Sequence, residues 1–154
     1  MVSVKEYYNE VIGHNSRLDE FQAAVLLVKL AQLPALTAQL QEAARLYAQH
    51  LAGIADLQLL VVASATYVYH PYVVRSACRD ALKQHLSQAG IGALVHYPVP
   101  PHRQQAYAHL NIPAGAYPIA EELAATSLSL PMWPGMKEHV AVVVGEAVQK
   151  FFQA

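Results

Sequence analysis

Charged residues are scarce in this sequence. Only 14% of the residues are Asp, Glu, Lys or Arg, and the formal net charge is −1. No run of Lys or Arg occurs, so the chain lacks the electrostatic footprint of a nucleic-acid-binding protein. Hydrophobic residues make up 55% of the chain, which leaves little charge to cover a surface. We expect either a well-packed, alanine-rich globule or apolar surface that meets another domain or subunit.

Cysteine is almost missing. The single Cys78 cannot form a disulfide within the chain and fits a reducing compartment. The apolar runs are far shorter than the roughly 18 residues that span a bilayer. The first residues are polar and rich in tyrosine, unlike a signal peptide. These features predict a soluble cytoplasmic protein with neither a membrane nor a nucleic acid as partner.

The histidines lack the spacing of a metal site. There are eight of them, but no H-x-x-x-H pair exists, and there is no second cysteine. His96, His102 and His109 are six and seven residues apart, which does not match the usual ligand spacings for zinc. No metal is expected.

Hydrophobic periodicity predicts two helices near the start. Ser16 and Asp19 resemble a capping box before an apolar run over 18–33. This run is apolar around most of its circumference, which is typical of a helix buried on several sides. Pro34 marks a break and can begin a second helix that ends near Leu51. The expected inner face of the second helix is Leu36, Leu40, Ala43, Ala44, Tyr47 and Leu51.

The rest of the chain alternates between short strands and helices, which indicates a two-layer α+β domain. Pro71 is expected to place its strand at a sheet edge or in a bulge. Three prolines within residues 98–101 predict a stiff loop. Strands are predicted over 57–62, 67–75, 91–97 and 127–130, turns over 63–65 and 113–117, and helices over 79–89, 103–109, 119–125 and from about 137 onward.

Four motifs follow one another along the chain. The first, over 13–24, reads GHNSRLDEFQAA. The second, over 68–80, contains VYHPYVVR followed by RD, and the third reads HYPVPPH from residue 96 with QAY at 105–107. The fourth combines Ala120-Glu121 with LSLPM at 128–132. The third is similar to a YP-x-P-x-H-x-Q-x-AY element, and together the motifs resemble the DegT/DnrJ/StrS family of pyridoxal-phosphate (PLP) nucleotide-sugar aminotransferases over nearly the whole chain.

The resemblance implies the fold of aspartate aminotransferase, fold type I, in which a large PLP-binding domain is followed by a small α+β domain. The chain is identified as the C-terminal portion. Residues 1–17 would be a loop carrying the phosphate-contact motif, and 18–154 a single C-terminal domain with a short, mainly antiparallel sheet packed with helices. Relatives are typically homodimers that transfer an amino group, usually from glutamate, to a keto group of a nucleotide-linked sugar.

The same resemblance places the catalytic machinery elsewhere. In the family, the lysine that holds PLP as a Schiff base and the acidic partner of the pyridine nitrogen lie upstream of this region. Of the five lysines here, Lys29, Lys83, Lys137 and Lys150 fall on predicted helices, and Lys5 has no glycine-rich setting. No catalytic residue is therefore expected in this chain, which alone should be inactive and bind PLP weakly or not at all.

Asn15 and Arg17 are the candidate cofactor-binding residues. By resemblance, Asn15 reaches across the dimer to the PLP phosphate, and an amide donor beside a helix start suits an anion. It could instead only satisfy backbone groups in its turn. Arg17 could bind phosphate or a donor carboxylate with its planar fork, or pair with Asp19 or Glu20. His14 could line the same substrate pocket or be a solvated turn residue.

His96, Tyr97 and His102 flank the stiff proline loop. Such a loop positions side chains with little entropy loss, and the resemblance implies that they touch the nucleotide-sugar or close its pocket. They could also be solvated surface residues. Two functions therefore stay open: a part of a PLP-dependent sugar aminotransferase, or a non-catalytic interaction or regulatory module derived from that family.

Overall fold

The computed structural model describes residues 7–59 and 67–153. Five α-helices, two short 3₁₀ helices and a three-stranded antiparallel sheet occur in this part of the chain, so the α+β prediction is confirmed. In chain order they are α1 (Glu20–Leu30), α2 (Leu33–His50), β1 (Gln58–Leu59), β2 (Tyr72–Arg75), α3 (Arg79–Gln88), η1 (Pro101–Arg103), η2 (Gln105–Leu110), α4 (Pro118–Thr126), β3 (Ser127–Leu130) and α5 (Glu138–Gln153).

The first helix begins two residues later than expected, and its cap is Asp19. The Asp19 side chain accepts a hydrogen bond from the backbone N–H of Gln22 at 2.7 Å, which satisfies one of the unpaired donors of the first turn. The predicted capping box that begins at Ser16 is therefore wrong. Arg17 has a left-handed backbone with φ of 65°, and this turn separates Ser16 from the helix.

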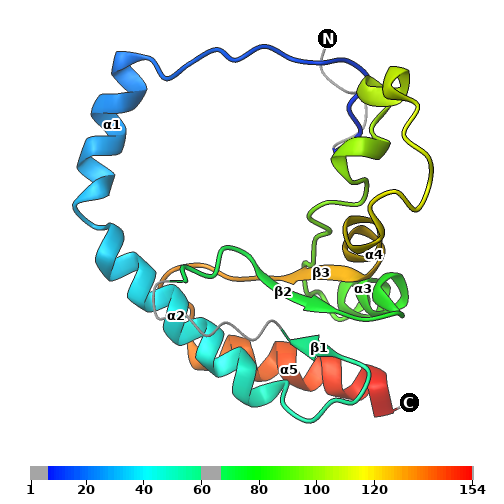
Figure 1. Cartoon of the computed structure of the whole chain (residues 1–154). Coiled ribbons are helices and arrows are strands. Elements are labelled where there is room, and N and C mark those ends of the chain that lie inside the picture. The colour runs from blue at the N-terminus through cyan, green and yellow to red at the C-terminus, as the bar shows by residue number, and fades with distance from the viewer. Residues whose placement is uncertain (1–6, 60–66, 154) are drawn as a thin grey trace.

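Helix α1 stands apart from the other elements, at the end of the extended segment that leads to it (Figure 1). None of its residues is buried. Phe21 is 81% exposed and Val28 is 71% exposed. The expected burial on several sides is therefore wrong within the described residues. An all-round apolar pattern predicts that a helix needs a covering surface, but it does not say which chain provides that surface.

The second helix carries one side of the hydrophobic core. Leu40, Ala43, Ala44 and Tyr47 are buried, as is Leu51 at the helix end, so the expected inner face is confirmed apart from Leu36, which is only partly buried. Within the described residues no single helix is long and apolar enough to cross a membrane. Helices α1 and α2 reach the necessary length and composition only as a pair bent by 65°.

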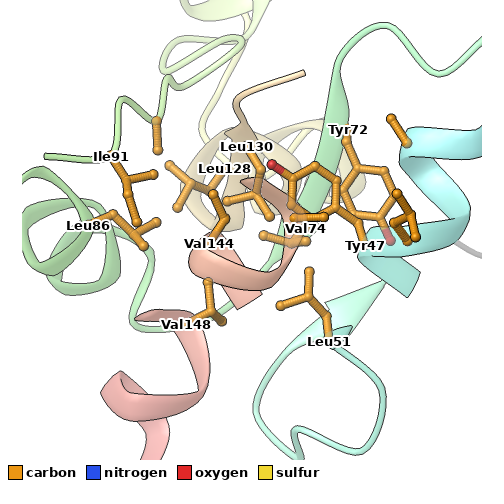
Figure 2. Packing of buried hydrophobic residues seen from close by; sticks show 14 of the residues in the cluster. Tyr47, Leu51, Tyr72, Val74, Leu86, Ile91, Leu128, Leu130, Val144 and Val148 are labelled. Atoms are coloured by element: carbon orange, nitrogen blue, oxygen red, sulfur yellow. The ribbon is translucent and has the colours of Figure 1, made fainter. Parts of the chain in front are cut away.

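The sheet has the order β1-β2-β3, and its two faces differ. Tyr72 lies opposite Leu130 and Val74 lies opposite Leu128. Because directly opposed residues of antiparallel strands share a face, these four apolar side chains form one surface. Figure 2 shows them in one cluster with Tyr47 of α2 and Val144 of α5. The intervening residues Val73, Arg75, Ser127 and Ser129 therefore belong to the second face.

The strands are shorter than the sequence pattern indicates. β2 begins at Tyr72, directly after Pro71, and it is the central strand. The edge position expected from Pro71 is wrong, because the proline lies just outside the ladder and removes none of its donors. Of the strand expected over 91–97, only Leu94 pairs, in an isolated bridge with Ser129. The turn expected over 63–65 and the end of the first strand lie outside the described residues.

The remaining elements agree with expectation. α3 is followed by Gly90, whose φ of 76° suits a glycine stop. α4, β3 and α5 are found within a residue or two of the expected bounds, and the proline loop leads directly into η1. The short helix expected over 103–109 is present as the two 3₁₀ helices.

The Tyr47 hydroxyl ties α2 to the end of β3. It donates to the carbonyl oxygen of Pro131 at 2.6 Å, and burial raises the pKa of Tyr47 above its usual range. We expect Tyr47→Phe to lower the free energy of unfolding by about 1–2 kcal/mol, because the partly buried carbonyl oxygen of Pro131 loses this donor. Urea unfolding followed by circular dichroism measures this. Tyr67→Phe, at a 37% exposed position, should change it by less than about 0.5 kcal/mol; equal losses would refute the assignment.

Candidate functional site

The N-terminal segment 7–19 is extended and runs from the η1–η2 side of the molecule to α1 (Figure 1). Near its end, the Asn15 side-chain oxygen accepts a hydrogen bond from the backbone N–H of Arg17 at 3.0 Å. This is the local turn contact that the sequence left as an alternative. It uses only the oxygen, and within the described residues the Asn15 amide nitrogen has no partner, so an anion could still receive its hydrogens.

Arg17 lies two residues beyond Asn15, and its guanidinium forms no ion pair within the described residues. Neither Asp19 nor Glu20 forms an ion pair with it among the described residues, and Asp19 is engaged in capping α1. The ion-pair alternative for Arg17 is therefore not found. His14 is exposed in the same segment. A planar cation and an amide donor on the same short segment are groups that suit a phosphate or carboxylate.

His96 and Tyr97 lie at the start of the proline loop, against the second face of the sheet. Nδ1 of His96 is 2.9 Å from the Ser129 hydroxyl oxygen. The Tyr7 ring meets both side chains edge-on, with centroid distances of 5.8 Å to His96 and 5.1 Å to Tyr97. Tyr97 nevertheless remains 60% exposed. His96 is thus fixed by its contact with Ser129 of the sheet, whereas the Tyr97 side chain is accessible to a ligand.

His102 has a different environment. Its side chain is only 9% exposed, and Nε2 is 3.0 Å from Oε1 of Glu121 in α4. Glu121 also accepts hydrogen bonds from the backbone N–H of Gly115. These contacts, with that of His102 the largest, hold the pKa of Glu121 below its usual range. The contact between His102 and Glu121 therefore joins η1 to α4.

Three cavities surround the loop, and Tyr97 lines all of them. One of about 480 Å³ lies between the second sheet face, the loop and α4, and it also contains His96 and Arg75. A second of about 460 Å³ extends from Tyr97 to Gly13, the neighbour of His14. A third of about 730 Å³ includes His96 and Trp133. The Arg75 guanidinium is paired with Glu122, so it is not a free cation for a ligand.

The predicted site residues therefore form two groups. His96 and Tyr97 are adjacent and share cavities. His14, Asn15 and Arg17 lie farther along the N-terminal segment, and within the described residues no hydrogen bond or ring contact joins them to the loop. His102 lines none of the three cavities. The same described residues contain no group of three His, Cys, Asp or Glu side chains that could hold a metal ion.

Gln104 is the residue that the sequence interpretation missed. It is only 8% exposed, and its side chain bonds to the backbone of both the N-terminal segment and the loop. The sequence interpretation takes Gln105 as the glutamine of the third motif, but Gln105 is exposed. Counting from Tyr97, the spacing YP-x-P-x-H-x-Q places the motif glutamine at 104. That spacing was the signal that could have found it.

The small antiparallel α+β fold matches the corresponding part of solved aminotransferase structures. A family model described as the DegT/DnrJ/EryC1/StrS aminotransferase family matches residues 1–149. The chain belongs to this family, and the resemblance seen in its sequence is confirmed. The aminotransferases of this family use pyridoxal phosphate.

Individual relatives support the same assignment. The chain is 42% identical, over 97% of its length, to the dTDP-3-amino-3,4,6-trideoxy-alpha-D-glucose transaminase of Streptomyces venezuelae. It is 39% identical over 98% of its length to the Pleiotropic regulatory protein of Geobacillus stearothermophilus. The crystal structure of S. venezuelae DesV matches 99% of the chain with 40% identity and a TM-score of 0.84. The chain spans about two fifths of the length of each of these proteins: 40%, 41% and 41%.

The His102–Glu121 contact predicts a pH dependence of stability. Because the folded pKa of Glu121 lies below its ordinary value of 4.5, the stabilisation is present above the unfolded pKa and is lost as the pH falls through the folded pKa. We expect wild-type protein to lose stability more steeply than Glu121→Gln between about pH 5 and pH 3. Urea midpoints across that range measure this.

A matched control is Glu146→Gln, which changes an exposed carboxylate of α5 that forms no ion pair among the described residues. Its acid profile should follow the wild type. A Glu121→Gln profile that also follows the wild type would show that the contact with His102 and Gly115 contributes nothing.

Proposed function

We propose that this chain is the small C-terminal domain of a PLP-dependent aminotransferase that acts on a keto group of a nucleotide-linked sugar. The observation that carries the proposal is a pair of donors on the N-terminal segment, the Asn15 amide nitrogen and the Arg17 guanidinium, that have no partner within the described residues. Both lie within the family match over 1–149. Hydrogen bonds from an amide and a guanidinium to a phosphate are charge-assisted and short. These two residues therefore fit the phosphate of the cofactor.

The other predicted residues take roles around the sugar. His14, His96 and Tyr97 bind the nucleotide-sugar, since Tyr97 is open to all three cavities and the cavity reaching Gly13 adjoins His14. His102 stays a substrate-site residue in this proposal, and it acts by closing the pocket wall through Glu121. When bound, PLP supplies the electron sink for moving the amino group.

Catalysis needs a lysine from outside this chain. The four lysines within the described residues, Lys29, Lys83, Lys137 and Lys150, are all exposed, whereas a Schiff-base lysine needs a desolvated pocket. Lys5 lies outside the described residues. We therefore propose that residues 1–17 form a loop with the phosphate contacts and that 18–154 form one domain. A large PLP-binding domain and a second subunit complete the site in the cytoplasm, and an amino-acid donor supplies the amino group.

A second candidate is a non-catalytic interaction or regulatory module. The apolar surface of α1 favours it, because exposed apolar patches mark contacts with other proteins. One relative is also named a pleiotropic regulatory protein. The two candidates differ in what the chain does when a large domain is present, and a chimera distinguishes them.

The chimera replaces the matching two fifths of the S. venezuelae transaminase with this chain. We expect the chimera to bind PLP and to transfer an amino group to that enzyme's keto-sugar, measured by cofactor absorbance and product formation. In the chimera, Asn15→Asp should weaken PLP binding about 10-fold or more, because it keeps the oxygen that bonds Arg17 but replaces the donor with a negative charge.

Asn111→Asp is the control for this substitution, since Asn111 is an exposed asparagine like Asn15. Its backbone is left-handed, with φ of 49°, a conformation that aspartate tolerates as asparagine does. The control should leave PLP affinity unchanged. A folded chimera that binds PLP but does not transfer an amino group would favour the regulatory candidate, and equal effects of both substitutions would remove Asn15 from the phosphate site.

The uncovered surface of α1 predicts that the chain associates with itself when no other partner is present. Phe21, Val25 and Val28 lie along one side of the helix at helical spacing. We expect sedimentation velocity to show concentration-dependent association of the wild type, and Phe21→Asp with Val28→Asp to reduce it. Val143→Asp, at a 53% exposed apolar position of α5, should leave it unchanged. A wild type that stays monomeric at all concentrations would contradict this role of α1.

A further inference from the structure

Gln104 is the one buried carboxamide among the described residues, and all of its polar atoms are used. Nε2 donates to the carbonyl oxygens of Tyr7 and Val99, each at 3.1 Å. Oε1 accepts from the backbone N–H of Asn9 at 2.8 Å. Both amide hydrogens and the oxygen therefore join backbone groups that lie almost a hundred residues apart in sequence.

Two further contacts fix the same junction. The carbonyl oxygen of Asn9 accepts from the backbone N–H of Ala106 at 3.0 Å, so Asn9 is held through both of its backbone polar groups. The Tyr7 ring rests on His96 and Tyr97. The N-terminal segment is thus fastened to the proline loop at Tyr7 and Asn9.

Beyond this junction the segment has little to hold it. Among the described residues, the hydrogen bonds of residues 14–19 are the local contact between Asn15 and Arg17 and those that Asp19 accepts from the first turn of α1. Residues 14–19 are exposed throughout. The place of Asn15 and Arg17 relative to Tyr97 therefore depends on the anchor formed by Gln104.

We propose that Gln104 is a positioning residue. It sets the separation between Asn15 and Arg17, on the N-terminal segment, and Tyr97, on the proline loop. Its meaning for catalysis depends on the function proposed above, but the positioning itself is a property of this chain. Gln104 is not a member of the hydrophobic core cluster. Its loss should therefore release the segment and leave the core intact.

The single cysteine makes the separation measurable. Cys78 is exposed beside α3, and Ser16→Cys adds a second exposed thiol on the segment. With nitroxide labels on both, double electron–electron resonance gives the distribution of distances between them. We expect one narrow distribution with Gln104 present and a broad one in Gln104→Leu. Amide exchange at Asn9 and Ala106 should become about tenfold faster or more.

Two companion variants separate the anchor from general destabilisation. Gln105→Leu changes the exposed glutamine next to it and should leave both readouts unchanged. Gln104→Glu keeps the size and the acceptor oxygen but loses the donors to Tyr7 and Val99, so it should broaden the distribution as Gln104→Leu does. It also provides the test if Gln104→Leu fails to fold. Core amides of α2 and α5 should keep their exchange rates in every variant.

An unchanged distribution in the Gln104 variants would overturn the proposal, as would equal broadening in Gln105→Leu. Neither readout needs cofactor or substrate, so the proposed function is tested separately. In the chimera, Gln104→Leu should weaken PLP binding to an extent similar to Asn15→Asp. A broadened distribution with unchanged PLP affinity would uphold the positioning and refute the phosphate role of Asn15 and Arg17.

Discussion

The pairing of β2 with β3 is the constraint on which the rest of the domain depends. Four opposed pairs, from Tyr72 with Leu130 to Arg75 with Ser127, put four apolar side chains on one face, and an arginine, two serines and a valine on the other. A shift of either strand by one residue would turn its other face toward the core, which would bring in the two serines of β3 or Val73 and Arg75 of β2. Burial of Tyr72, Val74, Leu128 and Leu130 against α2 and α5 therefore specifies the register, and the register determines what the second face offers.

The site is assembled on that second face. Ser129 meets His96, and small serine side chains leave room for the cavity below the proline loop. The loop in turn receives the N-terminal segment through Gln104 and is joined to α4 through His102 and Glu121. Each of these contacts is polar and lies outside the core. The contacts that arrange the candidate ligand residues are thus distinct from the apolar packing of the core.

Much of the fold could be predicted from the sequence because its signals are local. The glycine stop at Gly90, the apolar stripe of α5 and the alternation in 127–130 each reflect the periodicity of one element. Some of the failures depend on groups that are distant in the sequence. Residues 91–97 can form a strand only where they pair with β3, and the single pairing found is the bridge between Leu94 and Ser129.

The candidate site shows the same division. Motif order pointed to the family and to Asn15, Arg17, His96, Tyr97 and His102, but residue type could not tell that His102 faces a carboxylate or that Arg17 lacks one. Gln104 acts through bonds to Tyr7 and Val99. Such a role is invisible without the folded chain, although motif spacing could have located the residue.

Helix α1 shows that part of this chain's free energy of folding is not realised within one molecule. The helix is formed and capped by Asp19, but none of its residues is buried. Its apolar side chains contribute their full hydrophobic stabilisation only when another surface covers them. Any partner that covers α1 in the folded state and not in the unfolded chain adds to stability by mass action. The melting temperature of this domain should therefore rise with the concentration of the partner that covers α1.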